Sequence, residues 1–205
     1  VVRAIWREQR PGYLEIHRDM VDRVIEVPAA IRAWDGGLEF ARSDERKTAE
    51  AARETAARFN AAKRPAVIVG IETFRYKLQR EVVRLVERMG APCMTTVLGK
   101  GAFPMDHPLA MGVHIGPLSP PPIRRRVDEA DLVLNLGTLL TDMNLGSRAP
   151  SITRDRSIWA VGNRVNVSCH TYTDVGIRAF VRALRRERLR RHHERVTYAD
   201  NLKPA

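Results

Sequence analysis

The chain has 205 residues, of which 44% are hydrophobic, 29% charged and 6% aromatic, and its formal net charge is +11. This balance is typical of a globular protein with one sizeable core and excludes a mainly disordered chain. No apolar run approaches the roughly 20 residues that span a bilayer, so we expect no membrane partner.

Much of the positive charge lies in two places, the run RRERLRRHHER at residues 185–195 and the triplet at residues 124–126. A nucleic-acid surface also needs aromatic platforms or a recognisable reading motif. The chain has few aromatic residues and no zinc-finger, RRM or helix-turn-helix signature. We therefore interpret the charge as solvated and expect no nucleic-acid partner; salt-dependent DNA binding would favour the alternative.

The two cysteines, Cys93 and Cys169, are too few for a disulfide framework, and Cys93 lies in an expected buried strand. Residues 1–10 contain three arginines and lack the apolar stretch and small-residue cleavage site of a secretory signal. Both features favour a reducing compartment, and we expect a cytoplasmic protein.

The first residues form a small unit that looks incomplete. Residues 1–9 are compatible with a helix, and residues 13–16 alternate between apolar and polar side chains, as in a short strand. One helix and one strand cannot bury their own apolar faces, so residues 1–27 should be part of a larger domain. Residues 28–42, with proline and a Gly-Gly pair, are expected to be a linker.

Regular patterning begins at Ser43, which we expect to cap a helix that ends before Pro65. Strands and helices then alternate. The expected strands cover residues 65–70, 92–98, 132–136, 157–161 and 165–168, and the other expected helices cover 76–89, a shorter one ending at 127–130, and 175–184. This order predicts an α/β fold over residues 43–184: a Rossmann-like layered domain with a central parallel sheet of five or six strands and helices on both faces.

Two glycine-containing turns could contact a phosphate. Only Gly70 follows the first strand, so the G-x-G-x-x-G pattern is missing and NAD is not expected. Gly99, Lys100 and Gly101 begin the loop GKGAFPMDHPLAMGVHIG and combine backbone amides with a cation, but the Walker spacing is absent. We favour a structural turn there and retain these three residues as weak candidates for cofactor binding.

Two groups of polar residues remain. Asp106, His107 and His114 have no further ligand at metal-binding spacing, so we expect no metal site and no catalytic residue among them. Thr141, Asp142 and Asn144 closely follow the expected strand 132–136, where open α/β sheets place their ligand crevice. These short polar side chains could bind a ligand or a neighbouring domain, or could cap the backbone.

At these residues a family resemblance becomes visible. GPLS (116–119), EADLVLNLGTLLTDMNLG (129–146) and SCHTYTDV (168–175) resemble 2-oxo acid decarboxylases of the thiamine-diphosphate superfamily, with indolepyruvate and phenylpyruvate decarboxylases closest in look. RPGYLEIHRDMVD (10–22) is similar to the last strand of that family's pyrimidine-binding domain, with His17 where a proline is usual. The resemblance covers nearly the whole chain.

The resemblance implies a domain order. Residues 1–27 would end the pyrimidine-binding domain, residues 43–184 would be the central domain, and residues 185–205 would lead to the pyrophosphate-binding domain. In the family the activating glutamate and the GDG motif for magnesium and diphosphate belong to the flanking domains. Thiamine diphosphate and Mg2+ are therefore expected in the parent enzyme, not on this fragment alone. The implied partners are those two domains and further copies, as a dimer or tetramer.

The implied function is a structural and regulatory domain of a 2-oxo acid decarboxylase, with Thr141, Asp142 and Asn144 in regulatory or interdomain contacts. One alternative is an acetolactate synthase-like enzyme whose central domain binds FAD or ADP. LLTDMN resembles the decarboxylase pattern more closely, so neither nucleotide is expected. A second alternative is a free-standing nucleotide-binding module.

Overall fold

The computed structural model describes residues 1–37, 42–139, 152–193 and 196. The chain divides into two compact units, Val1–Ala41 and Arg42–Ala205. Within the described part of the chain, no helix is long and apolar enough to cross a membrane.

In its described residues, 1–37, the first unit contains short helices and no strand. They are α1 (Val2–Glu8), the 3-10 turn η1 (Arg18–Met20) and α2 (Ala29–Arg32). The expected helix at the start of the chain is confirmed, whereas the strand expected at residues 13–16 is wrong. Tyr13, Leu14 and Ile16 are exposed and unpaired with any strand of the described residues. Alternation alone cannot make a strand, because its backbone groups need a neighbouring strand.

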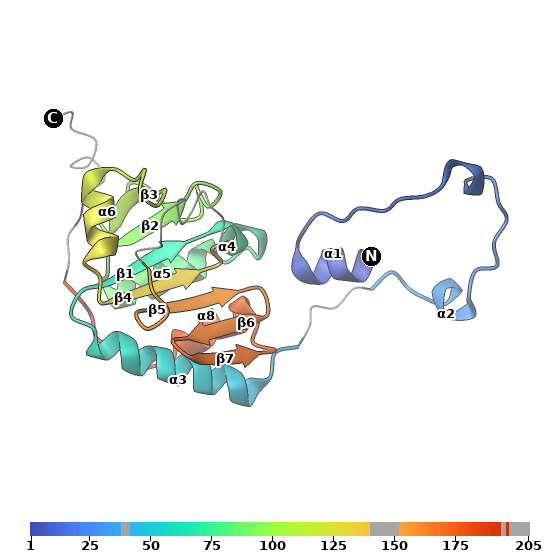
Figure 1. Ribbon diagram of the computed structural model, residues 1–205. Coiled ribbons are helices and arrows are strands. Elements are labelled where there is room, and N and C mark those ends of the chain that lie inside the picture. Colours follow the sequence, from blue (N-terminus) through green and yellow to red (C-terminus); the bar gives the residue numbers. More distant parts are fainter. Residues whose placement is uncertain (38–41, 140–151, 194–195, 197–205) are drawn as a thin grey trace. The chain divides into compact units, whose positions relative to one another are not determined.

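The second unit is built on one sheet (Figure 1). Its described strands are β1 (Pro65–Val69), β2 (Cys93–Thr96), β3 (Ala110–His114), β4 (Leu132–Leu136), β5 (Ser157–Val161), β6 (Arg164–Val167) and β7 (His170–Thr173), in the order β3-β2-β1-β4-β5-β6-β7. In this order, each neighbouring pair from β3 to β5 is parallel. The β5–β6 and β6–β7 pairs are antiparallel. The α/β, Rossmann-like fold is confirmed.

The sheet has more strands than the expected five or six. β3 lies inside the segment that we expected to be only a crossover loop, where Gly112 interrupts a short apolar run. β7 has the polar sequence HTYT and is mostly exposed at the edge of the sheet. Both are edge strands, so neither shows the continuous apolar pattern of a strand that is covered on both faces.

The described helices of this unit are α3 (Glu45–Ala61), α4 (Ile71–Arg75), α5 (Gln79–Met89), α6 (Pro121–Asp128) and α8 (Ile177–Leu184). The cap of α3 is Asp44 rather than Ser43, and its carboxylate accepts the backbone N–H of Lys47 at 2.9 Å. The Ser43 hydroxyl instead accepts the N–H of Gly176 at 3.0 Å, before α8. The helix expected over residues 76–89 begins later, because Lys77 has a left-handed φ of 52°.

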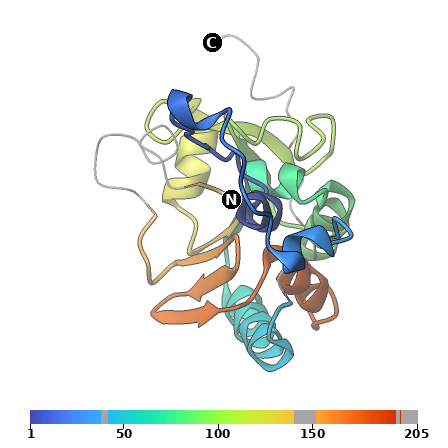
Figure 2. The same cartoon turned by 90° about the vertical axis from the view of Figure 1, so that its right-hand side faces the viewer.

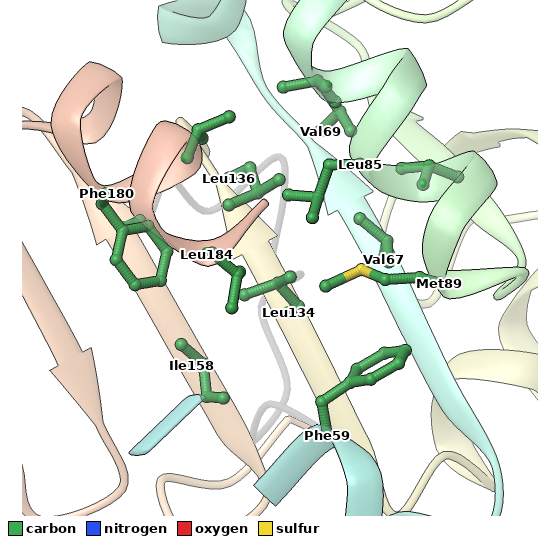
Figure 3. Close-up of a cluster of buried hydrophobic side chains, with 14 of the residues drawn as sticks. Phe59, Val67, Val69, Leu85, Met89, Leu134, Leu136, Ile158, Phe180 and Leu184 are labelled. Carbon is green, nitrogen blue, oxygen red and sulfur yellow. The ribbon is translucent and has the colours of Figure 1, made fainter. Parts of the chain in front are cut away.

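Helices cover both faces of the sheet, as predicted. Figure 2 shows α6 (yellow) on the opposite side from α5 (green) and α8 (red). The larger core lies under α3, α5 and α8, and Figure 3 shows Phe59 and Leu85 near side chains of β1 and β4, with Phe180 drawn over β5. The smaller core holds Ile123 and Val127 of α6. Burial on both faces explains the continuous apolar sequences of the central strands.

The amino ends of β1 and β4 are joined by Asp131. Its two carboxylate oxygens accept the backbone N–H groups of Lys63 at 2.6 Å and Arg64 at 2.9 Å. The Arg64 guanidinium also contacts Glu129 at 2.6 Å. These bonds fix the register in which Pro65 lies opposite Leu132.

Residues 187–192, which we call the C-terminal strap, lie against the domain. The Asn60 side chain donates to the carbonyl oxygen of Arg188 at 2.8 Å and accepts the N–H of Arg190 at 2.7 Å. His192 donates its backbone N–H to the Met89 carbonyl at 2.8 Å, and its ring meets Phe59 edge-on with centroids 5.2 Å apart. The start of the expected linker is thus attached to the domain, and its role as a linker to another domain stays a prediction.

Asn60→Ala should release the strap and lower the free energy of unfolding by about 1–2 kcal/mol, because two hydrogen bonds to backbone are lost. Urea unfolding measures the loss, and amide hydrogen exchange should become faster over residues 187–192. Asn60→Asp is the informative control, since it keeps an acceptor for Arg190 but removes the donor to Arg188. Unchanged exchange in Asn60→Ala would contradict the proposed anchoring.

Candidate functional site

The carboxyl ends of β1, β2 and β4 lie together at one edge of the sheet, where the strand order reverses between β1 and β4. In open α/β sheets such a reversal opens a ligand crevice. Here the loops pack backbone to backbone. A Cβ added to Gly70 would lie 2.2 Å from the Gly137 carbonyl oxygen, and one on Gly99 would lie 2.7 Å from the Val69 carbonyl oxygen. At both glycines the missing side chain lets two loops of this edge approach each other backbone to backbone.

Glu72 lies in the first turn of α4 at this edge (Figure 1) and is fully buried. Its carboxylate accepts the N–H of Gly162, in the β5–β6 turn, at 2.6 Å. The neighbouring Thr73 hydroxyl donates to the Leu136 carbonyl at 3.2 Å. These two bonds connect the start of α4 to the β5–β6 turn and to the end of β4.

The loop Gly99–Lys100–Gly101 uses its first amides internally. The N–H of Gly99 bonds the Thr96 carbonyl at 3.0 Å and lies 3.1 Å from the Thr96 hydroxyl, and the N–H of Lys100 bonds the Val97 carbonyl at 3.3 Å. Lys100 is exposed, and Gly101 has a left-handed φ of 91°. The geometry is that of a tight turn, and cofactor binding by these three residues stays a prediction.

The two histidines lie in separate environments, His107 in the loop before β3 and His114 at the end of β3. His107 accepts the N–H of Leu109 at 3.1 Å and contacts Glu87 at 3.5 Å. His114 is buried and lies 3.2 Å from the Ser119 hydroxyl, which already donates to the Gly116 carbonyl. His114 therefore donates from Nδ1 to that hydroxyl. No group of three His, Cys, Asp or Glu side chains in the described part of the chain could hold a metal ion.

Burial lowers the pKa of His114 from its ordinary 6.5 to about 4, against the opposing effect of the Asp128 charge. The folded protein thus prefers neutral His114, so stability should be full above pH 6.5 and fall as the pH drops toward 4. We expect a loss of roughly 3 kcal/mol across this window, measured by urea unfolding.

His114→Gln should remove most of this pH dependence, since glutamine does not titrate. His193→Gln, at an exposed position, is the matched control and should leave the profile unchanged. A wild-type profile that is flat between pH 6.5 and 4 after correction for the control would contradict the assignment to His114.

Thr141, Asp142 and Asn144 lie outside the described residues. The structure gives no position for these predicted interdomain residues, and their role remains a proposal.

One hollow in the structure was not predicted. It is a groove between α5 and the loop of residues 101–105, which we call the α5 groove, with a volume of about 540 Å³. Arg80, Arg84 and Glu87 line it from the helix. The only sequence signal was the spacing of the two arginines, one helical turn apart, and charged residues at that spacing are common on solvated helix faces.

Known proteins are similar to this chain across most of the second unit. Residues 52–187 match the family described as "Thiamine pyrophosphate enzyme, central domain". The chain belongs to this family. The predicted resemblance is confirmed at the level of the family, and the match covers β1 to α8, including the edge where the strand order reverses.

The matched proteins are much longer than this chain. Indole-3-pyruvate decarboxylase of Azospirillum brasilense is 33% identical over 175 residues, which is 85% of this chain and 31% of that protein. Pyruvate decarboxylase isozyme 2 of Saccharomyces cerevisiae is 33% identical over 146 residues, or 71% and 26% of the two chains. The structure of benzoylformate decarboxylase from Polynucleobacter necessarius matches with a TM-score of 0.57 at 20% identity. The match covers 84% of this chain and 32% of that one. The last comparison supports the fold alone.

Proposed function

We propose that this chain is the central domain of a thiamine-diphosphate-dependent enzyme that decarboxylates 2-oxo acids. The observation that carries the proposal is the similarity, across most of the chain, to relatives named as indole-3-pyruvate and pyruvate decarboxylases. The domain's role would be to space the flanking domains and to regulate the enzyme. The chain alone would not be catalytic.

The cofactor chemistry is assigned to other parts of the parent enzyme. Thiamine diphosphate, when bound, stabilises the carbanion left by departing CO2. Among the described residues, no group of three His, Cys, Asp or Glu side chains could hold the Mg2+ that accompanies the cofactor. We propose that the pyrimidine- and pyrophosphate-binding domains hold both.

An assay of the full-length enzyme distinguishes decarboxylation from acetolactate synthesis. Given pyruvate, phenylpyruvate and indolepyruvate separately, the enzyme should release CO2 and the corresponding free aldehyde, with preference for an aromatic or bulky side chain. Formation of acetolactate from pyruvate without free aldehyde would overturn the decarboxylase assignment and favour the synthase alternative.

We also propose that the central domain binds neither FAD nor ADP. The close backbone packing of Gly70 against Gly137 supports this proposal. Calorimetry of the chain with FAD, ADP and NAD should show no binding heat. A micromolar dissociation constant for FAD or ADP would favour the synthase-like alternative, and one for NAD would favour a free-standing nucleotide-binding module.

The proposed partners are the two flanking domains of the same chain and further copies of the enzyme, as a dimer or tetramer in the cytoplasm. Light scattering of the full-length enzyme should give a mass of two or four chains. DNA that binds the chain with a strong salt dependence would contradict the proposed absence of a nucleic-acid partner.

Asp142, with Thr141 and Asn144, is proposed to contact a neighbouring domain or a regulatory substrate. An interdomain hydrogen bond could couple ligand occupancy to active-site closure by about 1–3 kcal/mol. Asp142→Ala in the full-length enzyme should then flatten sigmoidal kinetics or lower kcat while the melting temperature stays unchanged. A loss of stability with normal kinetics would assign Asp142 to backbone capping instead.

A further inference from the structure

The α5 groove has the size of a small-ligand site. Its volume of about 540 Å³ lies within the range of roughly 300–1,000 Å³ that is usual for ligand pockets. Its walls come from two separate elements, the outward face of α5 and the loop of residues 101–105. The β2 strand and the turn at Gly99 separate these elements in sequence, so tertiary packing forms the groove.

Two guanidinium groups give the groove its charge. Arg80 and Arg84 lie one turn apart on α5 and are both exposed. Within the described residues neither has an ion-pair or hydrogen-bond partner. Like charges at this spacing repel each other, so a bound anion between them would remove a local energetic cost.

The nearby acidic groups do not neutralise this pair. Glu87, the one carboxylate among the residues lining the groove, contacts the His107 ring at 3.5 Å. Glu81 of the same helix contacts Arg182 of α8 at 3.7 Å. The two arginines therefore keep their charge available for an anion from solution.

Apart from the polar Gln79, the rest of the groove is lined mainly by apolar residues. Val83 lies between the two arginines in sequence and is half-buried, and the loop contributes Pro104 and the half-buried Met105. Behind them Phe103 is buried and packs edge-on against His107, with centroids 5.0 Å apart. This ring packing supports the shape of the loop wall, since aromatic pairs restrict each other's orientation.

We propose that the α5 groove binds a small organic carboxylate with an apolar body, the carboxylate between Arg80 and Arg84 and the apolar part against Val83 and Met105. Planar guanidinium groups match carboxylate oxygens in geometry and charge, and the apolar wall gives burial that a simple inorganic anion cannot use. The proposal does not depend on the proposed reaction.

The test uses phenylacetate as the probe and the 205-residue chain, followed by 1H–15N NMR. Phenylacetate should shift the amides of residues 79–87 and 101–105 saturably, with a dissociation constant on the order of 1 mM. Phenylacetamide, with the same body and no charge, and acetate, with the charge and no body, should each bind about tenfold more weakly. Added NaCl should weaken the binding of phenylacetate but not the binding of phenylacetamide.

A double variant, R80Q/R84Q, should weaken phenylacetate binding about tenfold or more and leave phenylacetamide unchanged. Arg53→Gln, at an exposed position of α3, is the matched control and should bind as wild type. Circular dichroism verifies that each variant is folded. Equal affinities for phenylacetate and phenylacetamide, saturable shifts only outside the groove, or wild-type binding by the double variant would each overturn the proposal.

Discussion

Gly70→Ala should lower the free energy of unfolding of the second unit by about 3 kcal/mol, because the added methyl group meets backbone on the facing loop. Its Cβ would lie 2.2 Å from the Gly137 carbonyl oxygen and 2.4 Å from the Thr138 Cα. Neither atom can rotate away as a side chain would. The loops after β1 and β4 would have to separate at the point where the strand order reverses.

Urea unfolding of the variant, followed by circular dichroism, measures the effect. Gly101→Ala is the control, because its Cβ would have nothing within 4 Å and only its φ of 91° resists the change. We expect a loss of about 1 kcal/mol there. If Gly70→Ala costs no more than Gly101→Ala, the close packing at this edge is not needed for stability.

Phe180→Ala should cost about 4 kcal/mol, since it removes a buried aromatic side chain and leaves a cavity. Phe180 lies on α8 and points into the larger core toward the sheet (Figure 3). Phe180 is 0% exposed, so the substitution removes contacts with protein atoms only.

Phe74→Ala is the matched control for this substitution. Phe74 has the same side chain, but it is 54% exposed on α4. Its replacement should change the melting temperature by only a small fraction of the Phe180→Ala effect, measured by thermal unfolding of both variants. Similar losses in the two variants would mean that α8 does not depend on this contact.

The central strands were predictable because parallel strands covered on both faces have continuous apolar sequences. β4 and β5 occupy the expected residues, and β1 ends one residue before the expected end. β3 and β7 were not predicted, because an edge strand needs no such pattern. The break between α4 and α5 depends on the left-handed backbone of Lys77, a conformation that local sequence does not specify.

The candidate site was less predictable than the fold. The glycines after the strands suggested phosphate contacts, but at Gly70 and Gly99 the missing side chain allows two backbones to approach each other. Sequence patterns cannot distinguish these two uses of glycine. The α5 groove could not be predicted either, because Arg80 and Arg84 meet Pro104 and Met105 only after the sheet has brought α5 and the loop together.

The hydrogen bonds of Asp131 to Lys63 and Arg64 join segments that are far apart in the sequence, and this separation affects the order of folding. The β5–β6 and β6–β7 pairs join neighbouring segments and can form locally, whereas the β1–β4 pair must wait for β4, because Pro65 pairs with Leu132. Closing the long loop between β1 and β4 costs conformational entropy, and contacts that hold the two ends of the loop together offset this cost. Asp131, bonded to Lys63 and Arg64, holds the two ends of this loop together in the folded domain. During synthesis, the emerging β1 stays without its central neighbour until the ribosome has released β4.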